Sequence, residues 1–100
     1  MAIADVQEKG SWIYVYDEKN KEISHMSSSG KELAGVASDF FVVIQGSWIY
    51  TYDDKCKEIA HMSSSGKEVR GAAGSSFTVK QGSWIYIYDR NCKEQSHRSA

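Results

Sequence analysis

The clearest pattern in the chain is an alternation of apolar side chains with a period of two. Residues 11–17 alternate aromatic rings with Ile13 and Val15. Aromatic and β-branched residues at this spacing are typical of a β-strand. The same octet, Gly-Ser-Trp-Ile-Tyr-x-Tyr-Asp, returns at 46–53 and 82–89, and its copies contain all three tryptophans and all six tyrosines. The chain is therefore organised around three copies of one strand.

Turn residues divide the rest of each repeat into further strands. Asn20 ends a short polar run and suits the left-handed position of a hairpin loop, and Gly30 takes that position in a second turn. Gln45-Gly46 is expected to form a tight two-residue hairpin into the next repeat. Each repeat is thus predicted to be a four-stranded antiparallel meander. The strands expected in the first repeat are residues 11–17, 21–27, 31–37 and 40–44.

The repeats align without a gap. Residues 10–45 and 46–81 are identical at 24 of 36 positions, and residues 82–100 match 46–64 at 12 of 19. Residues 2–9 occupy the place of a fourth strand and form a partial first unit. Such a period indicates a repeat architecture whose units pack on their neighbours. We therefore predict one domain over the whole chain, with 11 strands of a possible 12 and essentially no helix.

Both faces of the expected sheets are apolar. On one face the hairpin pairs aliphatic with aromatic residues, a favourable kind of cross-strand contact. The expected pairs are Val43–Trp48, Phe41–Tyr50, Val79–Trp84 and Phe77–Tyr86, and the opposite face carries Val42, Ile44, Ile49, Ile59 and Val69. Sheets with two apolar faces need cover on both sides. The prediction is an all-β, pseudo-threefold fold that is β-prism-like or propeller-like, and a three-sided prism and a two-chain propeller both remain open.

These motifs carry a family resemblance. The repeat Gly-Ser-Trp-Ile-Tyr-x-Tyr-Asp, followed by a Lys-Glu-Ile strand and a Ser-Ser-Gly-Lys-Glu turn, resembles a group of short bacterial proteins whose function is uncharacterised. More loosely, it is similar to the four-stranded blade of β-propellers. Neither resemblance implies catalytic residues.

Composition excludes several partners from the prediction. Twelve basic and 13 acidic residues give a net charge of −1, so neither nucleic acid nor an anionic membrane surface is favoured. There is no signal-peptide pattern or membrane-length apolar run, and we expect a cytoplasmic protein, with export by another route left open. Cys56 and Cys92 take the repeat position of Asn20 and are expected to be free thiols. No cofactor is expected.

The aromatic strands allow two interpretations. In the first, the tryptophans form one core layer, the tyrosines pack beside them, and the last tyrosine of each strand reaches the rim. In the second, the rings are platforms for the apolar face of a sugar, and three like sites provide avidity. The candidate ligand-binding residues are Trp12, Trp48, Trp84, Tyr16, Tyr52 and Tyr88.

The three histidines, His25, His61 and His97, occupy one repeat position. They could converge on a zinc ion and leave its fourth position open, or each could be a cross-strand neighbour of Ile13 or Leu33. The serine-rich turns lack the helix of a phosphate-binding loop, and threefold repetition argues against one asymmetric catalytic centre. We expect no enzyme, but a self-associating binding or scaffolding module, with carbohydrate binding and metal binding by the three histidines as alternatives.

Overall fold

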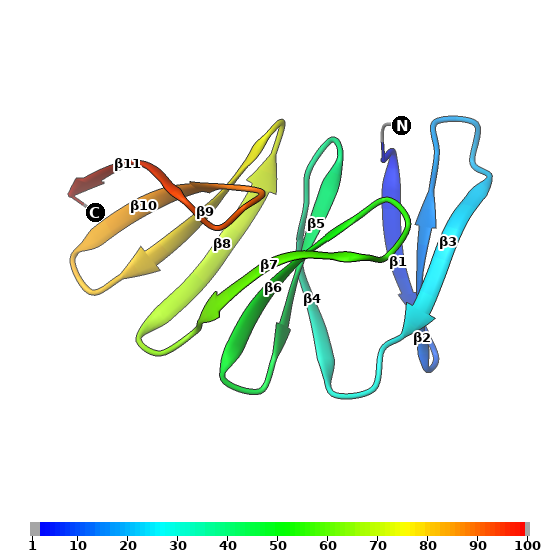
Figure 1. The fold of residues 1–100 in the computed structure, drawn as a ribbon, viewed down its shortest axis with the longest axis horizontal. Coiled ribbons are helices and arrows are strands. Elements are labelled where there is room, and N and C mark those ends of the chain that lie inside the picture. Colours follow the sequence, from blue (N-terminus) through cyan, green and yellow to red (C-terminus); the bar gives the residue numbers. More distant parts are fainter. Residues whose placement is uncertain (1–2, 100) are drawn as a thin grey trace.

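The computed structural model describes residues 3–99 as eleven antiparallel strands in three sheets, and these residues contain no helix (Figure 1). The first sheet contains β1 (Asp5–Lys9), β2 (Trp12–Tyr16) and β3 (Glu22–Ser27). The second contains β4 (Lys31–Val36), β5 (Phe40–Gln45), β6 (Trp48–Asp53) and β7 (Glu58–Ser63). The third contains β8 (Lys67–Ala73), β9 (Ser76–Gln81), β10 (Trp84–Asp89) and β11 (Glu94–Ser99). The predicted all-β class and the predicted 11 strands are confirmed, while the beginning of the predicted first strand, at Ala2, lies outside the described residues.

The boundaries between sheets fall at the serine-rich turns. These turns have Gly30 and Gly66 at φ 70°, the left-handed conformation that the sequence predicts. However, β3 does not pair with β4, nor β7 with β8, so the prediction of a hairpin here is wrong. Each turn instead carries the chain from one sheet to the next, which lets the sheets cover one another's apolar faces. Within residues 3–99 the first sheet has three strands and no counterpart of β4 or β8, as predicted.

The hairpins between β5 and β6 and between β9 and β10 differ from the prediction by one loop position. The loop is Gly46-Ser47, and Gly46 has φ 60°. The loop begins at Gly46 because a type II′ turn needs glycine at the first of its two loop residues. The register therefore shifts by two residues, which keeps the predicted face but changes every partner. The observed pairs are Gln45–Trp48, Val43–Tyr50, Phe41–Tyr52, Gln81–Trp84, Val79–Tyr86 and Phe77–Tyr88.

Each sheet has an aromatic face, which carries the Trp and Tyr side chains, and an aliphatic face on the other side. Two apolar clusters fill the spaces between the sheets. In the first, the aliphatic face of β1–β3 covers the aromatic face of β4–β7, and the buried residues include Val6, Ile13, Val15, Phe41 and Val43. In the second, the aliphatic face of β4–β7 covers the aromatic face of β8–β11, and the buried residues include Phe40, Val42, Ile49, Phe77 and Val79. The sheets are therefore stacked head to tail.

This stacking leaves two different faces at the ends of the row. The second sheet lies between the other two in Figure 1, and the molecule measures 39 × 25 × 18 Å. In the described chain, neither cluster covers the aromatic face of the first sheet or the aliphatic face of the third. The two end faces are thus the unlike halves of the contact that the chain makes twice internally.

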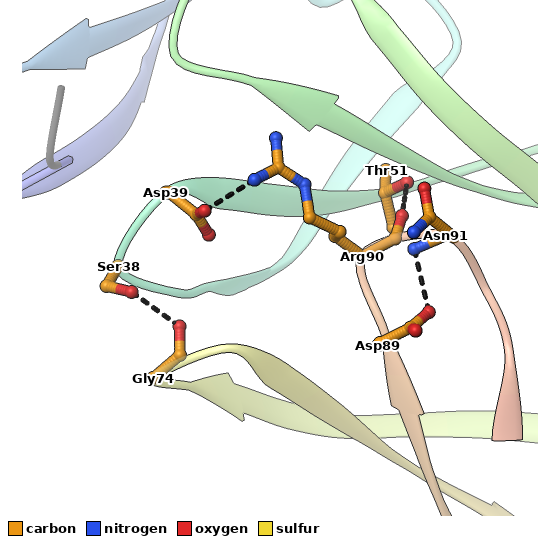
Figure 2. Close-up of polar contacts among 7 residues, drawn as sticks. All are labelled: Ser38, Asp39, Thr51, Gly74, Asp89, Arg90 and Asn91. Atoms are coloured by element: carbon orange, nitrogen blue, oxygen red, sulfur yellow. Dashed lines mark hydrogen bonds and ion pairs between the residues drawn. The ribbon is translucent and has the colours of Figure 1, made fainter. Parts of the chain in front are cut away.

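Polar contacts at the strand turns join the second sheet to the third (Figure 2). The buried Thr51 donates its hydroxyl to the carbonyl oxygen of Arg90 at 2.6 Å, and the Arg90 guanidinium lies 2.5 Å from the Asp39 carboxylate. Ser38 donates both its amide, at 2.9 Å, and its hydroxyl, at 2.6 Å, to the carbonyl oxygen of Gly74. Hydrogen bonds to turn carbonyls therefore align the two sheets.

Candidate binding platforms on the aromatic faces

The three tryptophans lie at the surface. Trp12, Trp48 and Trp84 are 44%, 45% and 46% exposed, and they are the exposed large apolar side chains among residues 3–99. The prediction of a tryptophan core layer is wrong. The shifted hairpin register is the reason, because it places each tryptophan beside the turn, opposite a polar residue of the preceding strand.

The tyrosines at the other end of these strands lie toward the core. Tyr52 is 9% exposed and stacks on Phe41 at 5.5 Å between ring centroids, and Tyr88 stacks on Phe77 at the same distance. Burial is the main cause that raises the pKa of Tyr52 and of Tyr88. Tyr16 is half-buried, with the Lys9 ammonium 5.9 Å from its ring centroid. The expectation that the last tyrosine reaches the rim is therefore wrong for Tyr52, and the exposed end of the aromatic strand is the tryptophan.

A histidine packs against each tryptophan. The edge-to-face distances between ring centroids are 5.3 Å for Trp12–His25, 5.3 Å for Trp48–His61 and 5.5 Å for Trp84–His97. Each imidazole also meets the central tyrosine of the strand, at 5.9, 5.6 and 5.7 Å between ring centroids. We use the word platform for each set of four residues: a tryptophan, its histidine, the central tyrosine and the glutamate three residues before the histidine. The platforms are Trp12/Tyr14/His25/Glu22, Trp48/Tyr50/His61/Glu58 and Trp84/Tyr86/His97/Glu94.

A glutamate holds each histidine. The Nδ1 atoms of His25, His61 and His97 each lie 2.9 Å from a carboxylate oxygen of the glutamate three residues earlier. In a regular strand, two residues three apart point to opposite faces. A bulge next to each of these glutamates places both side chains on the aromatic face. This pairing is repeated in all three sheets, and it orients each imidazole toward its tryptophan.

The histidines do not form a shared metal site in the described chain. They lie on β3, β7 and β11, one in each sheet, and each is the cross-strand partner of a tyrosine and not a neighbour of Ile13 or Leu33. Residues 3–99 contain no group of three or more His, Cys, Asp or Glu side chains that could hold a metal ion. The convergence on which the zinc hypothesis depends is therefore absent from this part of the molecule.

Polar residues flank each tryptophan across the neighbouring strands. The cross-strand partners on one side are Ser27, Ser63 and Ser99, and those on the other side are Lys9, Gln45 and Gln81. The hydroxyls of Ser27 and Ser63 each accept a backbone amide at 3.2 Å. Each platform is thus an indole framed by hydrogen-bonding groups, and the first differs from the others by carrying Lys9.

The repeated aspartates are structural. Oδ1 of Asp17, Asp53 and Asp89 accepts the backbone amides two and four residues later, at 2.9–3.0 Å. These bonds close the loop that ends with a left-handed residue, namely Asn20, Cys56 or Cys92. The aspartates therefore stabilise the turn that follows each aromatic strand.

Cys56 and Cys92 are free, half-buried thiols. The preceding sheet covers each of them: Ser24 Oγ lies 3.2 Å from Cys56 Sγ, and Cys92 packs against the apolar cluster between the second and third sheets. Burial raises the pKa of both thiols, from an ordinary 9.0 to about 11 for Cys92, although the Thr51 side chain lowers it in part. At neutral pH these thiols are therefore protonated and poor nucleophiles.

This burial predicts a loss of stability at alkaline pH. Between pH 9 and about 11, the Cys92 thiol ionises in the unfolded chain but stays protonated in the folded one, so stability is complete below pH 9 and falls as pH rises toward 11. Thermal unfolding followed by circular dichroism at pH 8, 9 and 10 is expected to show this fall. Cys92→Ala should flatten it between pH 9 and 10, and an unchanged slope in that variant would contradict the assignment to Cys92.

A shallow hollow of about 340 Å³ lies among Gly66, Lys67, Glu68, Lys80 and Gly82 at the turn end of the third sheet. No platform residue lines it. Its lining combines charges of both signs with turn glycines, so it provides no distinct chemistry, and the platforms remain the stronger candidate site.

Comparison of the chain with known protein families, with curated protein sequences and with solved structures found no match. The resemblance to short repeat proteins therefore remains a prediction. Among residues 3–99 no helix has the length and apolar character needed to cross a bilayer.

Proposed function

We propose that the protein is a non-catalytic carbohydrate-binding module with three like platforms. The observation that carries this proposal is the equal exposure of the three tryptophans, at 44%, 45% and 46%, although their sheets are covered to different extents. A large apolar ring that stays exposed in every copy is a feature of binding surfaces. Packing alone does not explain it, because the same strands bury their tyrosine ends.

The chemistry of the platform suits a sugar. A pyranose has an apolar face of C–H groups, which matches a flat indole, and a rim of hydroxyls that both donate and accept hydrogen bonds. In the second platform, His61 packs against Trp48 and is held by Glu58, and Gln45 is the cross-strand partner of Trp48. Together these side chains supply both kinds of group. One ligand ring could therefore stack on Trp48 and bond to its polar frame.

The histidine–glutamate pair supports the proposal because it fixes the orientation of the imidazole. When the ring is neutral and Nδ1–H donates to Glu58, Nε2 is left as an acceptor for a ligand hydroxyl. A group held in advance loses less conformational freedom on binding. The pair thus acts as a prepared polar contact beside each indole.

Repetition favours ligands with several equivalent units. Single small platforms bind weakly, but linked sites increase the apparent affinity by about 10²–10⁴ when the ligand can reach more than one of them. Three copies on one chain therefore fit a polysaccharide or a clustered glycan better than a free monosaccharide. The same repetition argues against catalysis, which needs distinct acid and base groups at one centre.

The test begins with a glycan array, followed by calorimetry on the best polymeric ligand. Trp48→Ala is expected to weaken binding about tenfold or more, and the triple variant at Trp12, Trp48 and Trp84 to abolish it, since each substitution removes one of three linked sites. Lys55→Ala, in an exposed turn of the same sheet, is the matched control and should bind like the parent. An array without signal, or binding that survives the triple substitution, would contradict the proposal.

A further inference from the structure

We propose that a second copy of this chain docks head to tail on the first, so that the aliphatic face of the third sheet of one copy covers the aromatic face of the first sheet of the other. Two such contacts would close a ring of six sheets from two chains. The proposal does not depend on the ligand of the platforms.

The first argument is continuity with the contacts inside the chain. The chain makes the same contact twice, each time with an aliphatic face on the following aromatic face. The two faces left at the ends of the row are one aliphatic face and one aromatic face, which is the same pair of faces that meets inside the chain. A surface that matches another part of the same molecule, and not itself, assembles head to tail.

The second argument is that each end face has a polar residue at the repeat position of one member of an apolar pair inside the chain. In the contact between the second and third sheets, Phe40 packs on Phe77 at 6.2 Å between ring centroids. On the two end faces the same repeat positions hold Ser76, in place of Phe40, and Asp5, in place of Phe77. An apolar pair is thus replaced by a hydroxyl donor and a carboxylate acceptor, which can form a charge-assisted hydrogen bond.

The third argument is an exposed serine on the third sheet whose equivalent on the first sheet is covered. At the contact between the first and second sheets, Ser24 donates to the Asp54 carbonyl oxygen at 2.6 Å and lies 3.2 Å from Cys56. Its equivalent on the third sheet is Ser96, which is exposed. In the docked pair Ser96 would meet the repeat positions of Asp54 and Cys56 in the first sheet of the other copy, which are Glu18 and Asn20.

The charges of the end faces make this contact weaker and more salt-sensitive than the internal ones. The aliphatic face of the third sheet has Lys80 and Arg98 where the second has Ile44 and Met62, and the opposing aromatic face has Asp5 together with Lys9. The charge of Asp5 favours this pairing, whereas that of Lys9 opposes it. Polar residues on terminal repeats also keep such faces soluble. The association is therefore expected to be reversible.

Two chains are enough for every end face to be covered once. Each copy would donate one aliphatic end and one aromatic end, and a twofold axis would leave neither open. Six sheets lie within the range of 4–8 blades found in closed propellers. Docking leaves the platforms accessible, because Trp48 and Trp84, whose sheets are already covered, are as exposed as Trp12.

The first test is the mass of the protein in solution. Sedimentation at concentrations up to about 100 μM and low salt is expected to show twice the 11.2 kDa of one chain. Ile87→Arg, at a half-buried position of the exposed aliphatic face, should return it to a monomer with unchanged circular dichroism. Lys55→Glu, in a turn outside both end faces, should remain dimeric.

The second test traps the contact with a disulfide. In a background of Cys56→Ala and Cys92→Ala, the pair Asn20→Cys and Ser96→Cys is expected to oxidise to a covalent dimer. Ser24→Cys with the native Cys56 calibrates the geometry inside one chain, where the two side chains already touch at 3.2 Å. A monomer at every concentration, with no covalent dimer while the calibration pair closes, would overturn the proposal; open polymers larger than two chains would overturn the ring.

Discussion

Phe77→Ala is expected to lower the free energy of unfolding by about 3–5 kcal/mol. Phe77 has no exposed surface, stacks on Tyr88 and packs against Phe40 from the neighbouring sheet. Its removal would leave a cavity between the second and third sheets. For a domain with a total stability of about 5–15 kcal/mol, this is a large fraction.

The sequence provides a matched control for this substitution. Asp5 occupies the same repeat position in the first sheet, but it is exposed because neither apolar cluster of residues 3–99 covers that face. Asp5→Ala is therefore expected to change stability by less than about 0.5 kcal/mol. Urea unfolding at low protein concentration measures both variants without a contribution from self-association. Similar losses for the two would contradict the head-to-tail stacking.

Gly35→Val is expected to destabilise the fold by about 1–3 kcal/mol, by forcing apart the second and third sheets. A Cβ atom at Gly35 would lie 3.0 Å from the Ala72 Cβ, 3.1 Å from the Ala72 amide nitrogen and 3.3 Å from the Gly71 carbonyl carbon. Two of these three atoms belong to the backbone of β8, which cannot move aside as a flexible side chain would. The close approach of β4 to β8 therefore requires glycine at this position.

A double-mutant cycle tests that explanation. Gly35→Ala should cost less than Gly35→Val, and adding Ala72→Gly should recover part of the loss because it removes the nearest side-chain atom. Chemical denaturation of the parent, the two single variants and the double variant gives the coupling energy. Strictly additive effects would mean that Gly35 matters for a reason other than its contact with the Ala72 Cβ.

The candidate site was predicted only in part from the sequence. The repeated tryptophans and histidines could be recognised, but their exposure depended on a hairpin loop that begins at Gly46 and not at Gln45. A shift of one loop position moves the register by two residues. That shift preserved the apolar face, while it exchanged the buried and exposed ends of the aromatic strand.

The histidine–glutamate pairs were missed for a related reason. Glu22 and His25 are three residues apart, and that spacing in a regular strand separates two side chains onto opposite faces. The bulge in β3 that unites them leaves a weak trace in the sequence. The recurrence of Glu-x-x-His at 22–25, 58–61 and 94–97 is the signal that could have found them.

Local properties were sufficient to predict the eleven strands, the left-handed turn residues and, among residues 3–99, the lack of a counterpart of β4 in the first sheet. Period-two alternation and turn chemistry depend on residues close in the chain, so one sequence reveals them. The grouping of strands into sheets depended on something else. The turn at Gly30 would serve a hairpin or a crossing between sheets equally well, and the head-to-tail burial of two apolar faces, a contact between residues far apart in the chain, selects the crossing.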